Sequence, residues 1–148
     1  MNIRPAARAD VPTLITLERA AATAAHWTAE QYHAIFSDQD VPRIALVIEQ
    51  ETEIDGFLIA RAVEHEWEIE NIAVAGPARR RGCGTRLLGS FLDTVRGQGA
   101  QAVFLEVRES NLAARRLYEK WAFVESGVRR WYYREPKENA IIYRFTFT

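Results

Sequence analysis

Residues 66–85 read EWEIENIAVAGPARRRGCGT, which places a strand, a glycine loop and the start of a helix in succession. The large apolar residues of the strand are Trp67, Ile69, Ile72 and Val74. The first two carry odd numbers and the last two even numbers, although side chains alternate between the faces of a strand. This change of phase predicts a β-bulge near Glu70-Asn71, which would leave backbone N–H and C=O groups available to a ligand. The alternative is a regular strand that is buried on both faces near its end.

After the loop, residues 84–96 repeat leucine, phenylalanine and valine at spacings of three and four, which predicts an amphipathic helix. Gly97 and Gly99 would end this helix. Residues 102–107 are almost continuously apolar, as in a strand that is covered on both faces. A strand, a helix and a strand within about forty residues predict a right-handed crossover between two parallel strands.

Further elements are predicted on both sides of this crossover. Asp10 followed by Pro12 indicates the start of a first helix, and Thr28 with Gln31 has the spacing of a capping box at the start of a second. Ser110 is the predicted cap of a later helix. The remaining expected segments are strands over 2–4, 43–50, 56–63, 123–133 and 140–147, and a helix over 111–120. The predicted fold class is a mixed α/β sheet in a single domain over 1–148.

The composition limits the class of protein. The 148 residues are 48% hydrophobic and 26% charged, and no apolar run approaches the ~20 residues of a membrane span. Residues 1–5 lack the apolar core of a signal peptide, so we expect a cytoplasmic protein with no membrane partner. A net charge of −1 argues against general nucleic-acid binding. The single cysteine excludes an intrachain disulfide, and the widely spaced histidines make a metal site unexpected.

The glycine loop is a candidate anion site. Gly82 and Gly84 allow a close approach to the backbone, while the helix N-terminus and the arginines over 79–81 supply positive charge suited to a diphosphate. The alternative is a solvated basic turn in which the glycines serve only the backbone geometry. The triphosphate motif that ends in glycine and lysine is absent, and no third glycine completes a dinucleotide fingerprint.

Several stretches together resemble the GNAT superfamily of N-acetyltransferases, and most closely its ribosomal-protein-alanine (RimI-type) group. The pyrophosphate motif of that family, Gln/Arg-x-x-Gly-x-Gly/Ala, is matched by Arg79–Gly84. Further matching stretches are Asn71–Val74, Leu105–Asn111, Leu117–Glu119, Arg129–Tyr133 and Asn139–Tyr143. The resemblance covers essentially the whole chain. It implies the acyl-CoA N-acyltransferase fold, a mostly antiparallel sheet with one parallel strand pair, flanked by about four helices.

Three positions depart from the family pattern. Cys83 stands where an aliphatic residue is usual, and a buried thiol packs as a small hydrophobe. Ala122 replaces a customary glycine, so the local turn is strained if it needs a positive φ. His26 and Trp27 lack the proline that often separates them, so we expect a differently shaped loop on the acceptor side.

Glu106 and Tyr118 are the candidate catalytic residues. Glu106 is an acid within an apolar strand, where desolvation should raise its pKa toward the working range of a base. A buried ion pair with an arginine explains the same pattern equally well. The phenol of Tyr118 can donate a proton, although a core tyrosine is the more common role on a helix. The resemblance favours the catalytic roles, since it implies that Glu106 is the base and Tyr118 the acid.

The resemblance also implies two groups of binding residues. Contacts with acetyl-CoA are expected from Ile72, Ala73, Val74, Arg79, Arg80, Arg81, Gly82, Cys83, Gly84, Thr85 and Asn111. The aromatic residues that either line the acceptor groove or belong to the core are Trp27, Trp131, Tyr132 and Tyr133. Glu70 shares a strand face with Glu66 and Glu68, and these acids either attract a cationic N-terminus or form a solvated face.

The expected reaction is the transfer of an acetyl group from acetyl-CoA to the N-terminal α-amine of a protein, without a metal. The resemblance implies the N-terminal alanine of a small-subunit ribosomal protein as the acceptor, with no direct nucleic-acid partner. A lysine side chain or a small-molecule amine is the alternative acceptor. The alternatives from other classes are a non-catalytic CoA-binding module and an RNA-binding protein that uses its arginines.

Overall fold

The computed structural model describes residues 1–21, 26–37, 40–76, 82–134 and 137–148. Within these residues, one seven-stranded sheet has the order β1-β2-β3-β4-β5-β7-β6. Its strands are β1 (Asn2–Pro5), β2 (Arg43–Gln50), β3 (Glu53–Val63), β4 (Glu66–Val74), β5 (Ala102–Arg108), β6 (Val124–Arg134) and β7 (Lys137–Thr146). Every neighbouring pair is antiparallel except β4 and β5, which are parallel. The predicted mixed sheet and its crossover are therefore confirmed.

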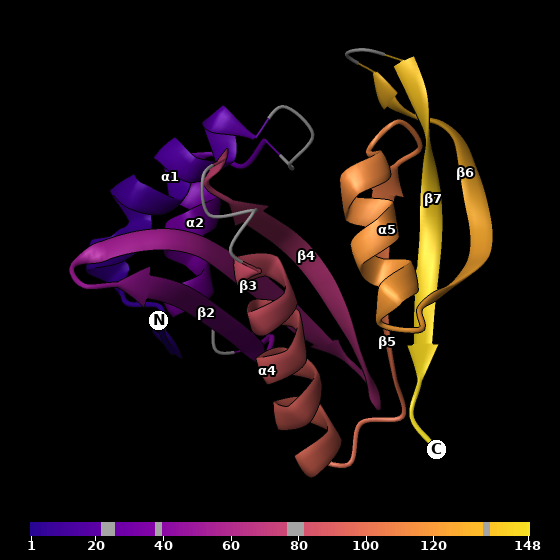
Figure 1. Ribbon diagram of the computed structural model, residues 1–148, viewed down its shortest axis with the longest axis horizontal. Helices are drawn as coiled ribbons and strands as arrows, with labels where there is room; N and C mark the ends of the chain where they lie inside the picture. Colours follow the sequence, from indigo (N-terminus) through magenta and orange to yellow (C-terminus); the bar gives the residue numbers. More distant parts are fainter. Residues whose placement is uncertain (22–25, 38–39, 77–81, 135–136) are drawn as a thin grey trace.

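Helices cover both faces of the sheet (Figure 1). Those within the described residues are α1 (Val11–Ala20), α2 (Ala29–Ser37), α4 (Cys83–Gly97) and α5 (Leu112–Lys120), with a 3₁₀ turn η1 (Arg8–Asp10) before α1. Residues of α4 and α5 share one apolar core with strand residues such as Leu58 and Leu105. Residues of α1 and α2 share a second core with Phe57 and Ile59. Because side chains alternate along β3, these two cores lie on opposite faces of the sheet.

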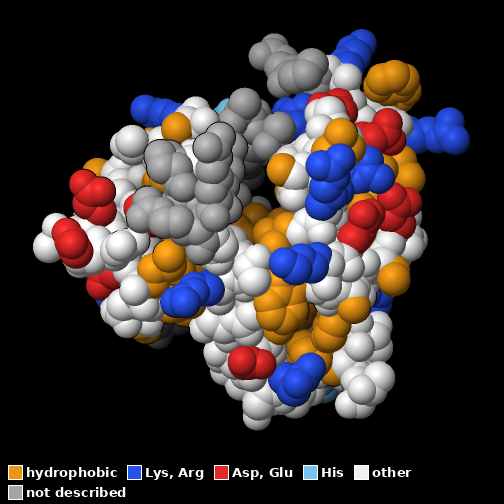
Figure 2. All heavy atoms as spheres, in the orientation of Figure 1, with side chains coloured by type: hydrophobic (Ala, Val, Ile, Leu, Met, Phe, Trp, Pro, Cys, Tyr) orange, Lys and Arg blue, Asp and Glu red, His pale blue; other side chains and the backbone are white. Residues whose placement is uncertain are grey.

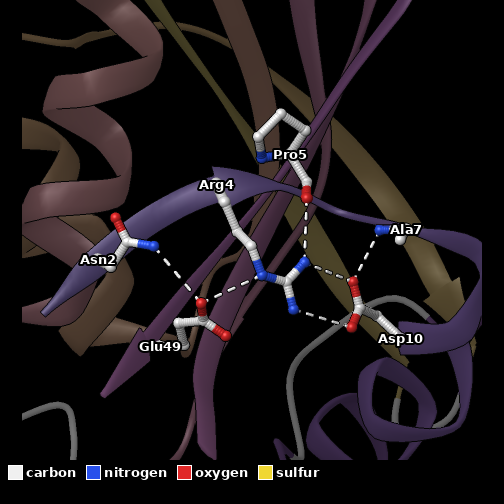
Figure 3. Close-up of polar contacts among 6 residues, drawn as sticks. All are labelled: Asn2, Arg4, Pro5, Ala7, Asp10 and Glu49. Carbon is white, nitrogen blue, oxygen red and sulfur yellow. Dashed lines mark hydrogen bonds and ion pairs between the residues drawn. The ribbon is translucent and has the colours of Figure 1, made fainter. Parts of the chain in front are cut away.

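Arg4 connects the N-terminal strand β1 to the 3₁₀ turn η1 through an ion pair (Figure 3). Its guanidinium donates to both carboxylate oxygens of Asp10, at 2.8 and 3.1 Å, and its Nε lies 3.2 Å from Glu49 on β2. Asp10 also accepts a hydrogen bond from the backbone N–H of Ala7 at 2.7 Å. The predicted helix start at Asp10 is confirmed, but its side chain makes no cap hydrogen bond within α1. Its oxygens serve the contact with β1 instead.

The starts of α2 and α5 test the other two capping predictions. Before α2, Thr28 Oγ1 accepts from the Gln31 N–H at 3.2 Å and Gln31 Oε1 accepts from the Thr28 N–H at 2.7 Å, so the capping box is confirmed. Before α5 the prediction of Ser110 is wrong. The cap is Asn111, whose Oδ1 accepts from the N–H of Ala114 at 3.2 Å. Both residue types are good caps, and the backbone geometry selects between them.

The strand β4 carries the predicted bulge. Asn71 pairs with Ile59 on β3, whereas the next pair joins Ile69 to Ala60, so Glu70 is the extra residue. The residues that pack against the core of α4 and α5 are Trp67 and Ile69 before the bulge and Ile72 and Val74 after it. The bulge therefore explains the change from odd to even numbering in the sequence.

The parallel strands β4 and β5 pair for only part of their length. Their register begins at Glu66 and Ala102 and ends at Ile69 and Leu105. Beyond that point each strand keeps its antiparallel neighbour, β3 for β4 and β7 for β5. Figure 1 shows the two strands spreading apart toward the end of β4. A bulge bends its strand, and this bulge lies where the parallel pairing ends.

Candidate active site

A cleft of about 750 Å³ opens where β4 and β5 separate. In Figure 2 a hollow lies near the centre of the face shown, beside α5. The predicted site residues that line the cleft are Trp27, Glu70, Ile72, Ala73, Val74, Gly82, Gly84, Thr85, Glu106, Asn111, Tyr118, Tyr132 and Tyr133. The structure therefore brings the candidate catalytic, coenzyme and acceptor residues to one cleft.

Two further predicted site residues, Cys83 and Trp131, do not line this cleft. The side chain of Cys83 is fully buried in the core beneath α4, so it packs as the expected small hydrophobe. Trp131 is 67% exposed and is not among the residues that line the cleft, so its role at the acceptor stays a prediction. Pairing between β6 and β7 is irregular at this point and Trp131 has a φ of 56°, so the backbone turns its ring to solvent. The predictions for Arg79, Arg80 and Arg81 lie outside the described residues.

The amino end of α4 forms one part of the cleft wall. Gly82 precedes the helix with a φ of 76°, a left-handed conformation that glycine adopts without strain. At Gly84 a Cβ would come within 3.3 Å of Leu117 Cδ2, so a larger residue would crowd α4 against α5. The first N–H groups of a helix have no intrahelical acceptor, and in this 15-residue helix they carry a partial positive charge. This end of the cleft is suited to an anion such as a diphosphate.

One edge of β4 faces the cleft after the bulge. Residues 71–74 pair with β3 along their other edge, while the pairing with β5 stops before them. Ile72, Ala73 and Val74 all line the cleft. A strand edge presents backbone N–H and C=O groups, so this edge can pair with an extended polar chain as a further strand would.

Glu106 lies on β5, and its neighbours Leu105 and Val107 point to the opposite face, into the core of α4 and α5. One of its carboxylate oxygens lies 2.9 Å from Nε of Arg129 on β6. Burial raises the pKa of Glu106, Arg129 opposes this shift, and nearby Glu68 adds to it. The predicted arginine partner is therefore present, although Arg129 is 54% exposed and the pair is not fully buried. The ion pair coexists with a pKa that burial raises, which is the direction that favours a base.

Tyr118 lies in α5 with 3% of its surface exposed. Its ring packs against the rings of Phe123 and Tyr143, with centroids 5.7 and 6.1 Å away. The same residue lines the cleft, so the core role and the cleft position do not exclude each other. Burial, and to a smaller degree Tyr133, raise the pKa of Tyr118, so its phenol keeps a proton that it can donate.

The acids on β4 are paired with arginines. Arg43 donates to Glu70 at 3.0 Å, and Arg61 donates to Glu68 at 2.8 Å. Glu66 pairs with an arginine on β7. Glu68 and Glu70 also line the cleft, as do Trp27, Tyr132 and Tyr133. This wall therefore consists of ion pairs and aromatic rings and not of a row of free acids.

The sequence does not predict a buried polar cluster that lies beside the bulge. Glu18 on α1 is 1% exposed. Its Oε1 accepts hydrogen bonds from the Trp27 N–H at 2.9 Å, the Tyr32 hydroxyl at 2.8 Å and the Asn71 amide at 3.0 Å. The signal in the sequence is an acid one turn after Leu14 on the apolar stripe of the helix. Its partner on β4 lies 53 residues away and leaves no local pattern.

Comparisons with known proteins identify a family and several similar proteins. The model of the acetyltransferase (GNAT) family matches residues 12–123. The [ribosomal protein bS18]-alanine N-acetyltransferase of Haemophilus influenzae is 35% identical over 121 residues, which cover 80% of this chain and 82% of that protein. The protein of the same name from Escherichia coli is 33% identical over 139 residues, which cover 88% of this chain and 94% of that protein.

Solved structures share the fold. The crystal structure of the ribosomal-protein-S18-alanine N-acetyltransferase from Escherichia coli superposes with a TM-score of 0.84 at 29% identity, covering 99% of this chain and 94% of that one. Ard1 from Thermoplasma volcanium gives a TM-score of 0.88 at 25% identity, covering 99% of this chain and 97% of that one.

Within the described residues, no helix is long and apolar enough to cross a membrane, and no three potential metal ligands cluster.

Proposed function

The chain belongs to the acetyltransferase (GNAT) family, and on that premise we propose that it uses acetyl-CoA to acetylate the N-terminal α-amine of a protein. Relatives at 33% and 35% identity carry the name [ribosomal protein bS18]-alanine N-acetyltransferase. They support the N-terminal alanine of a ribosomal protein as the acceptor, which the enzyme would meet in the cytoplasm.

One observation carries the proposal: Glu106 and Tyr118 line the same cleft as the amino end of α4 and the open edge of β4. Acyl transfer from a thioester to an amine needs a proton acceptor for the amine and a proton donor for the leaving thiolate. A diphosphate and an extended polar arm must also be held beside these groups. The described residues that could supply these four functions all line one cleft, which supports the proposal.

The described residues are compatible with acetyl-CoA. The amino end of α4, over Gly82–Thr85, would hold the pyrophosphate, and the open edge over Ile72–Val74 would pair with the pantetheine arm. The space between α4 and α5 is narrow, since a Cβ at Gly84 would lie 3.3 Å from Leu117. When bound, acetyl-CoA supplies an acetyl group that is activated as a thioester.

Glu106 and Tyr118 would divide the proton transfers between them. An α-amine has an ordinary pKa of about 8, so a minority is already neutral near pH 7 and the base has a modest task. Glu106, with its pKa raised by burial, accepts the proton of the amine. Tyr118, with its pKa raised by burial, donates its phenolic proton to the departing sulfur. A backbone N–H near Ile72 can donate to the carbonyl that is attacked.

Removal of each proton-transfer group tests these roles. Glu106→Gln and Tyr118→Phe should each lower kcat on an N-terminal alanine peptide by about 100-fold or more, with the acetyl-CoA affinity retained. Glu109→Gln, which removes an exposed acid just beyond β5, is the control and should leave kcat unchanged. If both catalytic variants acetylate at the wild-type rate, the assignment of these residues is wrong. Turnover of free amines without turnover of peptides would instead show that the acceptor is wrong.

A further inference from the structure

Glu18 joins three separate segments through one oxygen. Trp27 belongs to the cleft wall, Tyr32 to α2, and Asn71 to β4 directly after the bulge, and all three donate hydrogen bonds to Glu18 Oε1. Asn71 also donates to the Tyr32 hydroxyl at 3.0 Å, and the Trp27 and Tyr32 ring centroids lie 5.2 Å apart. This oxygen therefore connects the cleft wall that carries Trp27 to the bulged edge of β4 through hydrogen bonds.

Stability alone does not account for this cluster. An acid that is 1% exposed on the apolar stripe of a helix is costly, and well-packed apolar residues of similar volume stabilise a core at least as well. Asn71 is 4% exposed, and its Oδ1 has no hydrogen-bond partner among the described residues, which adds a further cost. A satisfied polar contact can nevertheless fix one geometry that apolar packing leaves less defined.

The position of the cluster indicates what this geometry serves. Asn71 and Ile72 are consecutive in β4, and Ile72 belongs to the edge that would pair with the coenzyme arm. Trp27, which donates to the same Glu18 oxygen, lies in the wall that would receive the acceptor. Burial first, and then the hydrogen bond to Glu18, raise the pKa of Tyr32, so its hydroxyl stays a donor within the cluster. The Glu18 cluster would therefore link the wall that receives the acceptor to the strand edge that pairs with the coenzyme arm.

We propose that Glu18 is a positioning residue for the acceptor. Its carboxylate holds Trp27 at a fixed position relative to the bulged edge of β4. This proposal rests on the proposed function, because it takes the wall beside Trp27 as the place of the acceptor. Glu18 acts through Trp27 and does not touch the reacting atoms. Loss of the hydrogen bonds to Glu18 should therefore raise the KM for the acceptor and leave the binding of acetyl-CoA unchanged.

The combined variant Glu18→Leu, Tyr32→Phe and Asn71→Leu separates this role from a structural one. It replaces the accepting carboxylate and both side-chain donors by apolar groups, so that only the backbone N–H of Trp27 loses its acceptor. We expect a folded protein with a modestly lowered melting temperature and an acceptor KM raised by about 5-fold or more, with the acetyl-CoA KM within about 2-fold. Glu18→Gln keeps an accepting oxygen and should leave both KM values within about 2-fold.

The wild-type rate on an N-terminal alanine peptide is measured first. If the wild type does not use the peptide, the proposed function is wrong, and the same comparison of variants is made with the amine that it does acetylate. A folded triple variant with a wild-type acceptor KM overturns the proposal, and so does an equal rise of both KM values. If the triple variant does not fold, Tyr32→Phe carries the test. Its acceptor KM should rise by about 2- to 5-fold, and an unchanged value overturns the proposal.

Discussion

Glu106 lies between opposing electrostatic influences. Burial raises its pKa, Arg129 from β6 lowers it through the contact at 2.9 Å, and Glu68 from β4 raises it. Tyr133 is a further titratable neighbour, since burial first, and then the charge of Glu106, raise the pKa of Tyr133 to about 12. A base acts in its ionised form, so kcat/KM should fall as the pH drops through the pKa of Glu106. The α-amine of the acceptor also titrates, with an ordinary pKa of about 8, so Glu106 contributes a second break to this acid limb, and the position of that break reports the environment of the carboxylate.

Arg129→Gln removes the influence that lowers the pKa of Glu106. We expect the acid limb of the kcat/KM profile to move to higher pH, because the carboxylate then loses its proton less readily. The measurement is the acetylation rate against pH at saturating acetyl-CoA. Arg130→Gln makes the same change of charge at the next residue and should leave the limb in place. A limb that stays or moves to lower pH in the Arg129 variant would contradict the proposed base.

Ala122 is strained as the sequence comparison suggested, because its φ is 69° in the turn after α5. Ala122→Gly should raise the free energy of unfolding by about 1 kcal/mol, since glycine adopts this conformation without a Cβ clash. Ala113→Gly, at an exposed position inside α5, should lower it by about 1 kcal/mol. Urea unfolding of the two variants measures both values. Destabilisation of similar size at both positions would argue against strain at Ala122.

The contact between β1 and η1 predicts how stability depends on pH. The hydrogen bond from Arg4 lowers the pKa of Asp10, burial opposes the shift, and the Ala7 N–H adds to it. A carboxyl whose pKa is lowered on folding stabilises the fold at neutral pH, and this contribution is lost as the pH falls through the folded pKa. Arg4→Gln should therefore lower the melting temperature at neutral pH, and the difference from the wild type should shrink below about pH 4.

Thermal melts at neutral pH and at about pH 3 measure this difference. Arg19→Gln removes an exposed arginine from α1 and serves as the control, with a small effect that does not change with pH. A difference at Arg4 that is equally large in acid would show that the arginine stabilises β1 by packing and not through Asp10.

Local patterns predict the elements well where neighbours in the sequence decide the structure. The capping box at Thr28 and the bulge at Glu70 are properties of a few consecutive residues, and both are confirmed. The strands β3 and β7 begin earlier than predicted, at Glu53 and Lys137, because pairing with a partner strand extends them through polar residues. The exposure of Trp131 follows from an irregular register between β6 and β7, which no local pattern records.

The cleft itself is a property of the whole molecule. It exists because the bulged β4 parts from β5, and its walls come from segments as distant in sequence as Trp27 and Tyr132. The family resemblance named several of the lining residues, such as Ile72, Glu106 and Tyr118, because the motifs of a family mark positions that its fold brings together. Composition and periodicity could not predict Glu18 as a contact of Asn71, because a partner 53 residues away becomes a neighbour only when α1 packs on β4.

Acetylation of an α-amine is the central claim for this molecule, and one peptide tests it most directly. The peptide carries an N-terminal alanine and a single internal lysine, and it is incubated with the full chain and acetyl-CoA. Tandem mass spectrometry then locates the added acetyl group. We predict that the group lies on the α-amine and that a peptide with a blocked N-terminus stays unmodified. An acetyl group on the lysine, or no transfer to the peptide at all, would contradict the assignment.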